Sequence, residues 1–118
     1  MTRLPDPEST MELSVEEVAA LAEAIARGEV LLLDCREDDE WRINRLPGAR
    51  LVALSSFATA AAAVLGDGNA PCVIYCHHGM RSLRAVEWLR SHGHTQAWSM
   101  RGGIDAWSDR IDPTVPTY

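Results

Sequence analysis

Two short, uninterrupted apolar runs, at residues 30–33 and 72–75, constrain the fold of this chain more than any other feature. Each run has the length of a β-strand and lacks alternating polar residues, which is typical of strands covered on both faces. Weaker strand patterns occur at residues 50–54 and 95–99. A sheet of such strands is buried on both sides, so it needs helices from the segments in between.

Helical patterns do lie between these runs. Ser14 and Glu17 form a capping box ahead of a stretch, residues 15–26, whose apolar residues recur at helical spacing. Gly28 then ends this helix. The alternation predicts an α/β fold, a three-layer domain in which a central, mostly parallel sheet has helices on both faces. The other helices are expected over residues 37–43, 56–65 (ended by Gly66-Asp67-Gly68), 82–91 and 104–111.

The length and apolar content of the chain suit one domain. With 118 residues, 47% of them hydrophobic, the chain can build one core. Residues 1–11 are polar and include two prolines, so we expect a disordered leader there and a single domain over residues 12–118.

Charge and hydropathy exclude some partners. A net charge of −6 argues against nucleic-acid binding, which relies on clustered positive charge. No run approaches the ~20 apolar residues that a membrane span needs, and the N-terminus lacks the apolar core of a signal peptide. We therefore expect a cytoplasmic protein with no membrane partner.

The most informative segment is Cys76-His77-His78-Gly79-Met80-Arg81-Ser82, which follows the apolar run at 72–75. A cysteine stands where a buried strand ends, and a short glycine-containing loop leads into a helix. Ligand sites of parallel sheets lie beyond the carboxyl ends of the strands, and helix N-termini stabilise anions. The pattern therefore predicts a reactive Cys76 thiolate beside the fixed charge of Arg81.

The cysteines also allow two other interpretations, as packing residues and as metal ligands. Cys35 and Cys72 are interpreted as small packing residues, because each lies within or just after an apolar strand. Cys72, Cys76, His77 and His78 could be metal ligands. Their spacing on a strand would point successive side chains to opposite faces, so neither a metal site nor another cofactor is expected.

Four segments together resemble the rhodanese family of sulfurtransferases, over nearly the whole chain after residue 12. Each match is weak alone, but the four occur in the family's order. They are Leu32-Leu33-Asp34-Cys35-Arg36-Glu37 (a strand followed by Asp-x-Arg), Glu40-Trp41 with Leu46-Pro47-Gly48-Ala49, residues 76–82 as the active-site loop, and Gly102-Gly103-Ile104-Asp105-Ala106-Trp107. The chain departs from the commonest pattern at Asn44 and Arg45, where the family usually has Gly-His.

The resemblance implies an enzyme that carries sulfur as a persulfide on Cys76 and passes it to a thiol, cyanide or a sulfur-carrier protein. The backbone of residues 77–82 would cradle the sulfur, and Arg81 would complete the loop. Asp34 and Arg36 would brace the loop from the side, although a purely structural ion pair is an equally good interpretation of these two residues.

The sulfur donor would be thiosulfate or the persulfide of a cysteine desulfurase. His77 and His78 stand where strong thiosulfate users often carry cations, and imidazoles are charged only in part near neutral pH. Two alternatives remain: a phosphatase or arsenate reductase of rhodanese fold, and a non-catalytic binding module. The loop has one residue fewer between Cys76 and Arg81 than the corresponding phosphatase loop, and inactive modules usually lack the cysteine.

Overall fold

A single five-stranded sheet forms the centre of the molecule. The structure, a computed structural model, describes residues 4–65 and 70–118. The strand order is β1-β5-β4-β2-β3, and all four pairings are parallel, so the predicted mostly parallel sheet is confirmed as wholly parallel in the described residues. The strands are β1 (Glu12–Leu13), β2 (Leu31–Asp34), β3 (Ala49–Leu51), β4 (Cys72–Tyr75) and β5 (Ala97–Met100).

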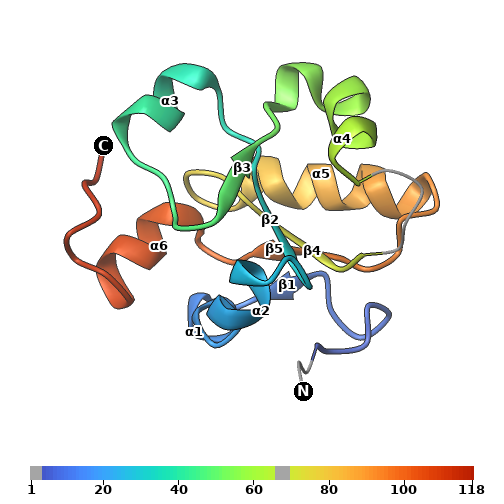
Figure 1. Cartoon of the computed structure of the whole chain (residues 1–118), viewed down its shortest axis with the longest axis horizontal. Coiled ribbons are helices and arrows are strands. Elements are labelled where there is room, and N and C mark those ends of the chain that lie inside the picture. The colour runs from blue at the N-terminus through green and yellow to red at the C-terminus, as the bar shows by residue number, and fades with distance from the viewer. Residues whose placement is uncertain (1–3, 66–69) are drawn as a thin grey trace.

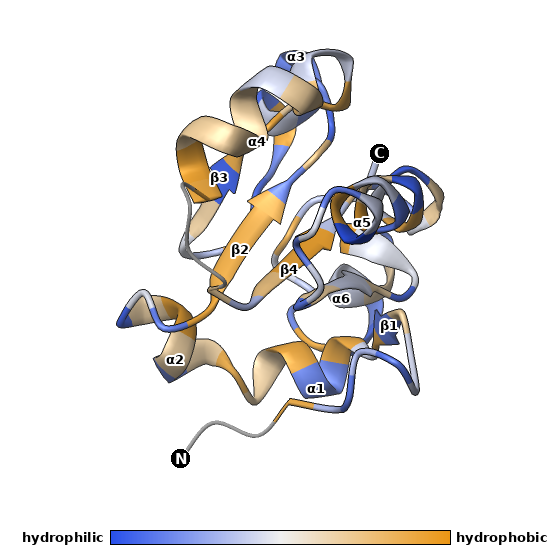
Figure 2. Ribbon diagram, turned by 90° about the vertical axis from the view of Figure 1, so that its right-hand side faces the viewer, coloured by the Kyte–Doolittle hydropathy of each residue, from blue (hydrophilic) through white to orange (hydrophobic). Residues whose placement is uncertain are grey.

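The two apolar runs became the inner strands β2 and β4. All of β4 and most of β2 are buried, and Figure 2 shows both as largely apolar ribbons. The strand expected at residues 50–54 is shorter and earlier, because the chain turns at Leu54 into a 3₁₀ turn. Strand β1 was not predicted from sequence. It has two residues, too few to show a periodicity, and is defined by pairing of Glu12 with Ser99 on β5.

The helices follow the predicted pattern with one correction. The single helix expected over residues 15–26 is divided in two, because Leu21 has a non-helical backbone (φ −91°, ψ 6°). The capping box of Ser14 and Glu17 is present at its start. The helical elements are α1 (Val15–Ala19), α2 (Ala22–Ala26), α3 (Asp38–Ile43), η1 (Leu54–Ser56), α4 (Phe57–Leu65), α5 (Met80–Ser91) and α6 (Gly103–Arg110). The glycines expected to end α4, at residues 66–68, lie outside the described residues.

Helices cover both faces of the sheet, as predicted, and each face has its own core (Figure 1). Under α1, α2 and α6, residues such as Leu32, Val73 and Trp98 form one apolar cluster. Under α4 and α5, Leu33 and Ile74 belong to a second cluster. Neighbouring residues of one strand thus enter opposite layers, which explains why β4 and the first three residues of β2 carry no charged side chain.

A disordered leader is predicted over residues 1–11, and the described part of it, residues 4–11, makes contacts with the domain. Leu4 packs on the first core cluster. The Arg90 guanidinium donates to the carbonyl oxygens of Pro7 (2.6 Å) and Thr10 (2.9 Å). None of the helices in residues 4–65 and 70–118 has the length and apolar character of a membrane-spanning segment.

Candidate active site

Cys76 lies at the carboxyl edge of the sheet, directly after β4. A loop to Gly79 follows, and α5 begins at Met80. Gly79 has φ +106°, in the left-handed region that favours glycine, and a Cβ there would come within 3.2 Å of the Gly102 nitrogen. Glycine at this position therefore lets the chain turn back over the cysteine sulfur and start the helix.

The sulfur of Cys76 is held by three hydrogen-bonding groups. The Gly79 N–H donates to Sγ at 3.1 Å and the Ser82 N–H at 3.4 Å, while the Ser82 hydroxyl lies at 3.5 Å. Ser82 is fixed in turn, because its hydroxyl oxygen lies 2.7 Å from the Ser99 hydroxyl on β5 and 3.1 Å from the Gly79 carbonyl oxygen. Of the residues expected to cradle the sulfur, Gly79 and Ser82 provide its backbone donors.

This environment makes Cys76 acidic although it is only 1% exposed. Its pKa is lowered to about 4, first by the neighbouring Cys35 thiol and then by the hydroxyl and N–H of Ser82 and the N–H of Gly79, against the opposing effect of burial. Burial alone has the reverse effect on Cys72, whose pKa is raised to about 12. Cys76 is thus held as a thiolate at neutral pH, while Cys72 stays protonated.

The start of α6 fixes the back of the loop. The N–H groups of Ile104 and Asp105 donate to the carbonyl oxygens of Cys76 (2.9 Å) and His77 (3.1 Å). Gly103, with φ +63°, lies so close that a Cβ would overlap both carbonyl groups. These carbonyl oxygens thus accept hydrogen bonds from α6 on one side of the loop, while the N–H groups of Gly79 and Ser82 donate to the sulfur.

Arg81 is paired with an acidic residue. Its guanidinium binds both carboxylate oxygens of Glu40 on α3, at 2.6 and 2.8 Å. The bidentate pair lowers the pKa of Glu40 to about 2, so the carboxylate is ionised throughout the neutral range. Most of the positive charge expected beside the loop is therefore neutralised by an acidic partner.

Asp34 and Arg36 form a buried ion pair at the end of β2. Both side chains are fully buried, and Arg36 Nη2 lies 2.6 Å from Asp34 Oδ2. The same guanidinium donates to Asn44 Oδ1 (2.7 Å) and to the Tyr118 hydroxyl (2.9 Å). This hydroxyl donates to Glu40 (2.7 Å). Asp34 and Arg36 thus reach the loop through Tyr118, Glu40 and Arg81 rather than by direct contact.

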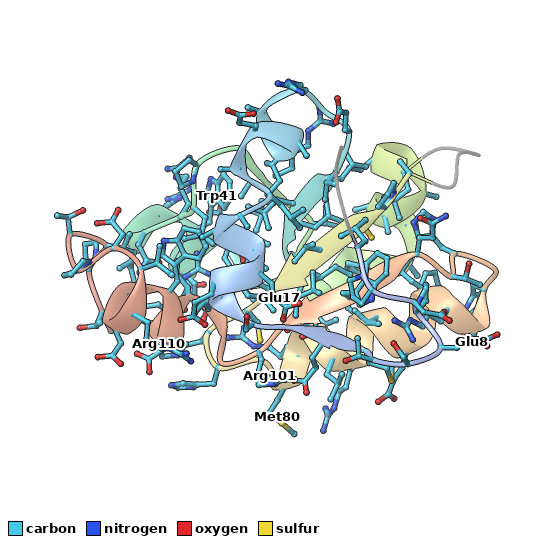
Figure 3. The ribbon with its side chains drawn as sticks, turned by 90° about the horizontal axis from the view of Figure 1, so that it is seen from below. Glu8, Glu17, Trp41, Met80, Arg101 and Arg110 are labelled. Atoms are coloured by element: carbon cyan, nitrogen blue, oxygen red, sulfur yellow. The ribbon has the colours of Figure 1, made fainter. Side chains whose placement is uncertain are left out.

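Aromatic rings form one side of the loop mouth. The His77 ring stacks between those of His78 and Tyr118, with centroids 3.9 Å apart on each side. Burial and the adjacent His78 lower the pKa of His77, so its neutral form is favoured. Met80, 67% exposed, projects outward from the start of α5 (Figure 3).

Sequence reasoning did not single out Tyr118, Ser99 or Asp105 as parts of this region. Asp105 lies 3.8 Å from His78, and together with His77 the two residues could offer ligand atoms to a metal ion, all within 4.8 Å of one another. A hollow of about 800 Å³ lies beside His78 and Asp105 and continues along α6 to Thr117. The contact of Tyr118 with Arg36 could not be predicted, because the two residues lie 82 positions apart and no local sequence pattern marks Tyr118.

Comparisons with known proteins agree with this geometry. The family described as Rhodanese-like domain matches residues 17–110. The Arabidopsis thaliana protein "Rhodanese-like/PpiC domain-containing protein 12, chloroplastic" is 32% identical over 98% of this chain, which spans 40% of that relative's length. Thiosulfate sulfurtransferase GlpE of Pseudoalteromonas translucida is 30% identical, covering 76% of this chain and 84% of its own. The human single-domain sulfurtransferase TSTD1 superposes with a TM-score of 0.69 and 26% identity, covering 86% of this chain and 97% of its own.

Proposed function

Because this chain belongs to the rhodanese-like domain family, we propose that it is a sulfurtransferase that carries sulfane sulfur as a persulfide on Cys76. The observation that carries the proposal is the hydrogen bonding of the buried Cys76 sulfur, which accepts from the N–H groups of Gly79 (3.1 Å) and Ser82 (3.4 Å). Its pKa is lowered to about 4, so the thiolate is the form present at neutral pH. Thiolates are the nucleophilic form of cysteine, so the group is ready to attack a donor sulfur at neutral pH.

The first half-reaction with thiosulfate follows from this arrangement. The Cys76 thiolate attacks the outer sulfur of thiosulfate, the bond between the two thiosulfate sulfurs breaks, and sulfite leaves with the bonding electron pair. The N–H groups of Gly79 and Ser82, which bond the thiolate, would also stabilise negative charge on the persulfide that replaces it.

In the second half-reaction an acceptor removes the outer sulfur. A thiolate, cyanide or the thiol of a carrier protein attacks it, and the Cys76 thiolate is restored as leaving group. The low pKa favours this step too, because a more acidic thiol leaves more readily.

The donor remains a choice between thiosulfate and the persulfide of a cysteine desulfurase. GlpE, a relative covered over most of its length, is named a thiosulfate sulfurtransferase, which favours thiosulfate. The neutralised Arg81 and the partly buried His77 supply little positive charge for a dianion, which favours a protein donor. Three free thiols suit a reducing compartment, so we place this activity in the cytoplasm.

A phosphatase function is not favoured. Oxyanion-binding loops of that kind need a free guanidinium to clamp the substrate, whereas Arg81 is bound to Glu40 through two hydrogen bonds. A purely non-catalytic module would have no use for the donors that hold the Cys76 thiolate.

The proposal is tested by sulfur transfer from thiosulfate to cyanide. We expect Cys76→Ser to abolish the transfer with an unchanged circular dichroism spectrum, while Cys72→Ser and Cys35→Ser retain most of it. Intact mass after incubation with thiosulfate should show one added sulfur atom in the wild type and none in Cys76→Ser. A donor panel with a persulfidated cysteine desulfurase covers the second donor. A Cys76→Ser protein that still gains sulfur would refute the assignment.

A further inference from the structure

Cys35 and Cys76 occupy matching positions on neighbouring strands. The parallel register of β2 and β4 ends with Asp34 opposite Tyr75, and the Cys35 N–H continues the ladder by donating to the Tyr75 carbonyl at 3.0 Å. The next facing pair is therefore Cys35 and Cys76. Neighbouring strands run about 4.8 Å apart, within the Cα separations of about 4.4–6.8 Å that a disulfide can bridge.

The two thiols also point into the same layer of the fold. Side chains alternate along a strand, and Cys35 and Cys76 belong to the same core cluster as Leu33 and Ile74, two residues before each of them. Both cysteines are buried, at 0% and 1% exposure. Cys72 lies in the same cluster but faces Leu31, four register positions from Cys35, or roughly 13 Å along the strand. Cys72 is therefore a buried cysteine of the same core cluster that does not face Cys76 or Cys35 across the sheet.

We propose that Cys35 is a resolving thiol that discharges the Cys76 persulfide as hydrosulfide when no acceptor is present. This inference rests on the persulfide of the proposed function. Cys35 Sγ attacks Cys76 Sγ, a Cys35–Cys76 disulfide forms, and the bond from Cys76 Sγ to the outer sulfur breaks. The outer sulfur takes the electron pair and the Cys35 proton and leaves as hydrosulfide. The sulfane sulfur is reduced to sulfide and the two cysteine sulfurs are oxidised to the disulfide, so no other oxidant is needed.

The surroundings of the pair suit this reaction. Cys76 and burial raise the pKa of Cys35, so Cys35 rests as a thiol beside the Cys76 thiolate. Its sulfur becomes nucleophilic as its proton passes to the anionic outer sulfur of the persulfide, which then departs as hydrosulfide. The Gly79 and Ser82 N–H groups bond Cys76 Sγ, so they lie next to the bond that breaks and can stabilise the negative charge that develops there. Since Cys35 is fully buried, it reaches sulfur through Cys76 rather than from solution. A small or protein dithiol, oxidised to its own disulfide, would return the enzyme to its starting state.

The central experiment follows a loaded enzyme without acceptor. The full chain is loaded with thiosulfate, desalted, and monitored for hydrosulfide and for peptides joined by a disulfide. We expect the wild type and the matched control Cys72→Ser to release one hydrosulfide per persulfide and to yield a Cys35–Cys76 linked peptide. Cys35→Ser and Cys35→Ala should keep the persulfide and release none. A wild-type persulfide as long-lived as that of Cys35→Ser would overturn the proposal.

A second experiment separates this proposal from the persulfide on which it rests. Hydrogen peroxide converts the Cys76 thiolate to a sulfenic acid, and attack by Cys35 then gives the same disulfide and water. The wild type and Cys72→Ser should form the Cys35–Cys76 disulfide, whereas Cys35→Ser should retain a trappable sulfenic acid. If thiosulfate loads no variant while peroxide forms this disulfide, the proposed function fails at its donor and the resolving pair stands. Absence of the disulfide in both experiments refutes the resolving pair.

Discussion

At the scale of the residue, Cys76 and Cys72 show that burial alone does not set the pKa of a cysteine thiol. Both thiols are buried, yet the pKa of Cys72 is raised to about 12 and that of Cys76 lowered to about 4. The difference comes first from the Cys35 thiol beside Cys76, and then from the hydroxyl and N–H of Ser82 and the N–H of Gly79. An acidic thiol therefore needs a loop and a neighbouring strand as well as a cysteine.

This difference predicts the pH dependence of alkylation. A lowered pKa means that the reactive thiolate persists as pH falls, until pH reaches the folded-state value. We expect the rate of Cys76 alkylation by iodoacetamide to be flat through the neutral range and to fall with an inflection near 4. Ser82→Ala, which removes one donor, should move the inflection upward. An inflection near the ~8.5 of a free cysteine would contradict the proposed role of the donors.

A second residue-scale prediction concerns charge at the loop mouth. Thiosulfate is a dianion, and the permanent cation of the loop, Arg81, is already paired with Glu40. His78→Lys adds a permanent charge at an exposed position, so kcat/KM for thiosulfate should rise by about 3-fold at low salt, with the gain shrinking as salt screens the charge. His92→Lys, at the far end of α5, makes the same substitution away from the loop and should leave kcat/KM unchanged. Equal effects in both variants would assign the gain to net charge.

Sequence reasoning located Cys76 because strand, glycine loop and helix are local signals. It interpreted Cys35 as packing, since its place beside Cys76 depends on the pairing of β2 with β4, which lie about forty residues apart. Tyr118 was missed for the same reason, as it meets Arg36 from 82 residues away. Asn44, a departure from the family pattern, gains a physical reason in the structure, because it binds the buried Arg36 side chain.

At the scale of the element, the sequence located β2 and β4, two strands that are buried on both faces of the sheet, to within one residue. Continuous burial on both faces identified β2 and β4, whereas β1 depends wholly on its partner strand. The break between α1 and α2 at Leu21 could not be predicted from the sequence, because Leu21 keeps the apolar spacing of the helix and is itself buried. Periodicity records which side chains face the core, and a short kink preserves it.

The contact between α6 and the loop gives an element-scale prediction. Gly103→Ala places a Cβ against the carbonyl groups of Cys76 and His77 and should lower the free energy of unfolding by more than ~3 kcal/mol or displace the loop with loss of activity. Gly93→Ala is the matched control, because φ is also positive (+93°) but the space is open. Gly93→Ala should lower the free energy of unfolding by only about 1–2 kcal/mol, which is the cost of a left-handed backbone for a residue with a Cβ. Urea unfolding and thiosulfate assays of both variants measure the difference, and equal effects would refute the close approach.

At the scale of the whole molecule, one polar network joins segments that the sequence keeps apart. It runs from Asp34 and Arg36 at the end of β2 through Tyr118 to Glu40 on α3 and Arg81 on α5. The ion pair at its start is buried, and its free hydrogen-bonding positions are filled by Asn44 and Tyr118. Such a network links α3 and the C-terminal segment to Arg81 at the start of α5.

The network predicts unequal consequences for two similar substitutions. Asp34→Asn leaves the Arg36 guanidinium buried without its counter-charge, which should lower the free energy of unfolding by about 3–5 kcal/mol. Asp38→Asn removes the carboxylate from an exposed pair with Arg42, where the Asp38 side chain is 62% exposed, and should cost under about 1 kcal/mol. Urea unfolding of both variants checks the contrast. If Asp34→Asn lost sulfur transfer but unfolded like the wild type, the pair would act on the loop chemistry rather than on the fold, and its interpretation as a structural brace would be wrong.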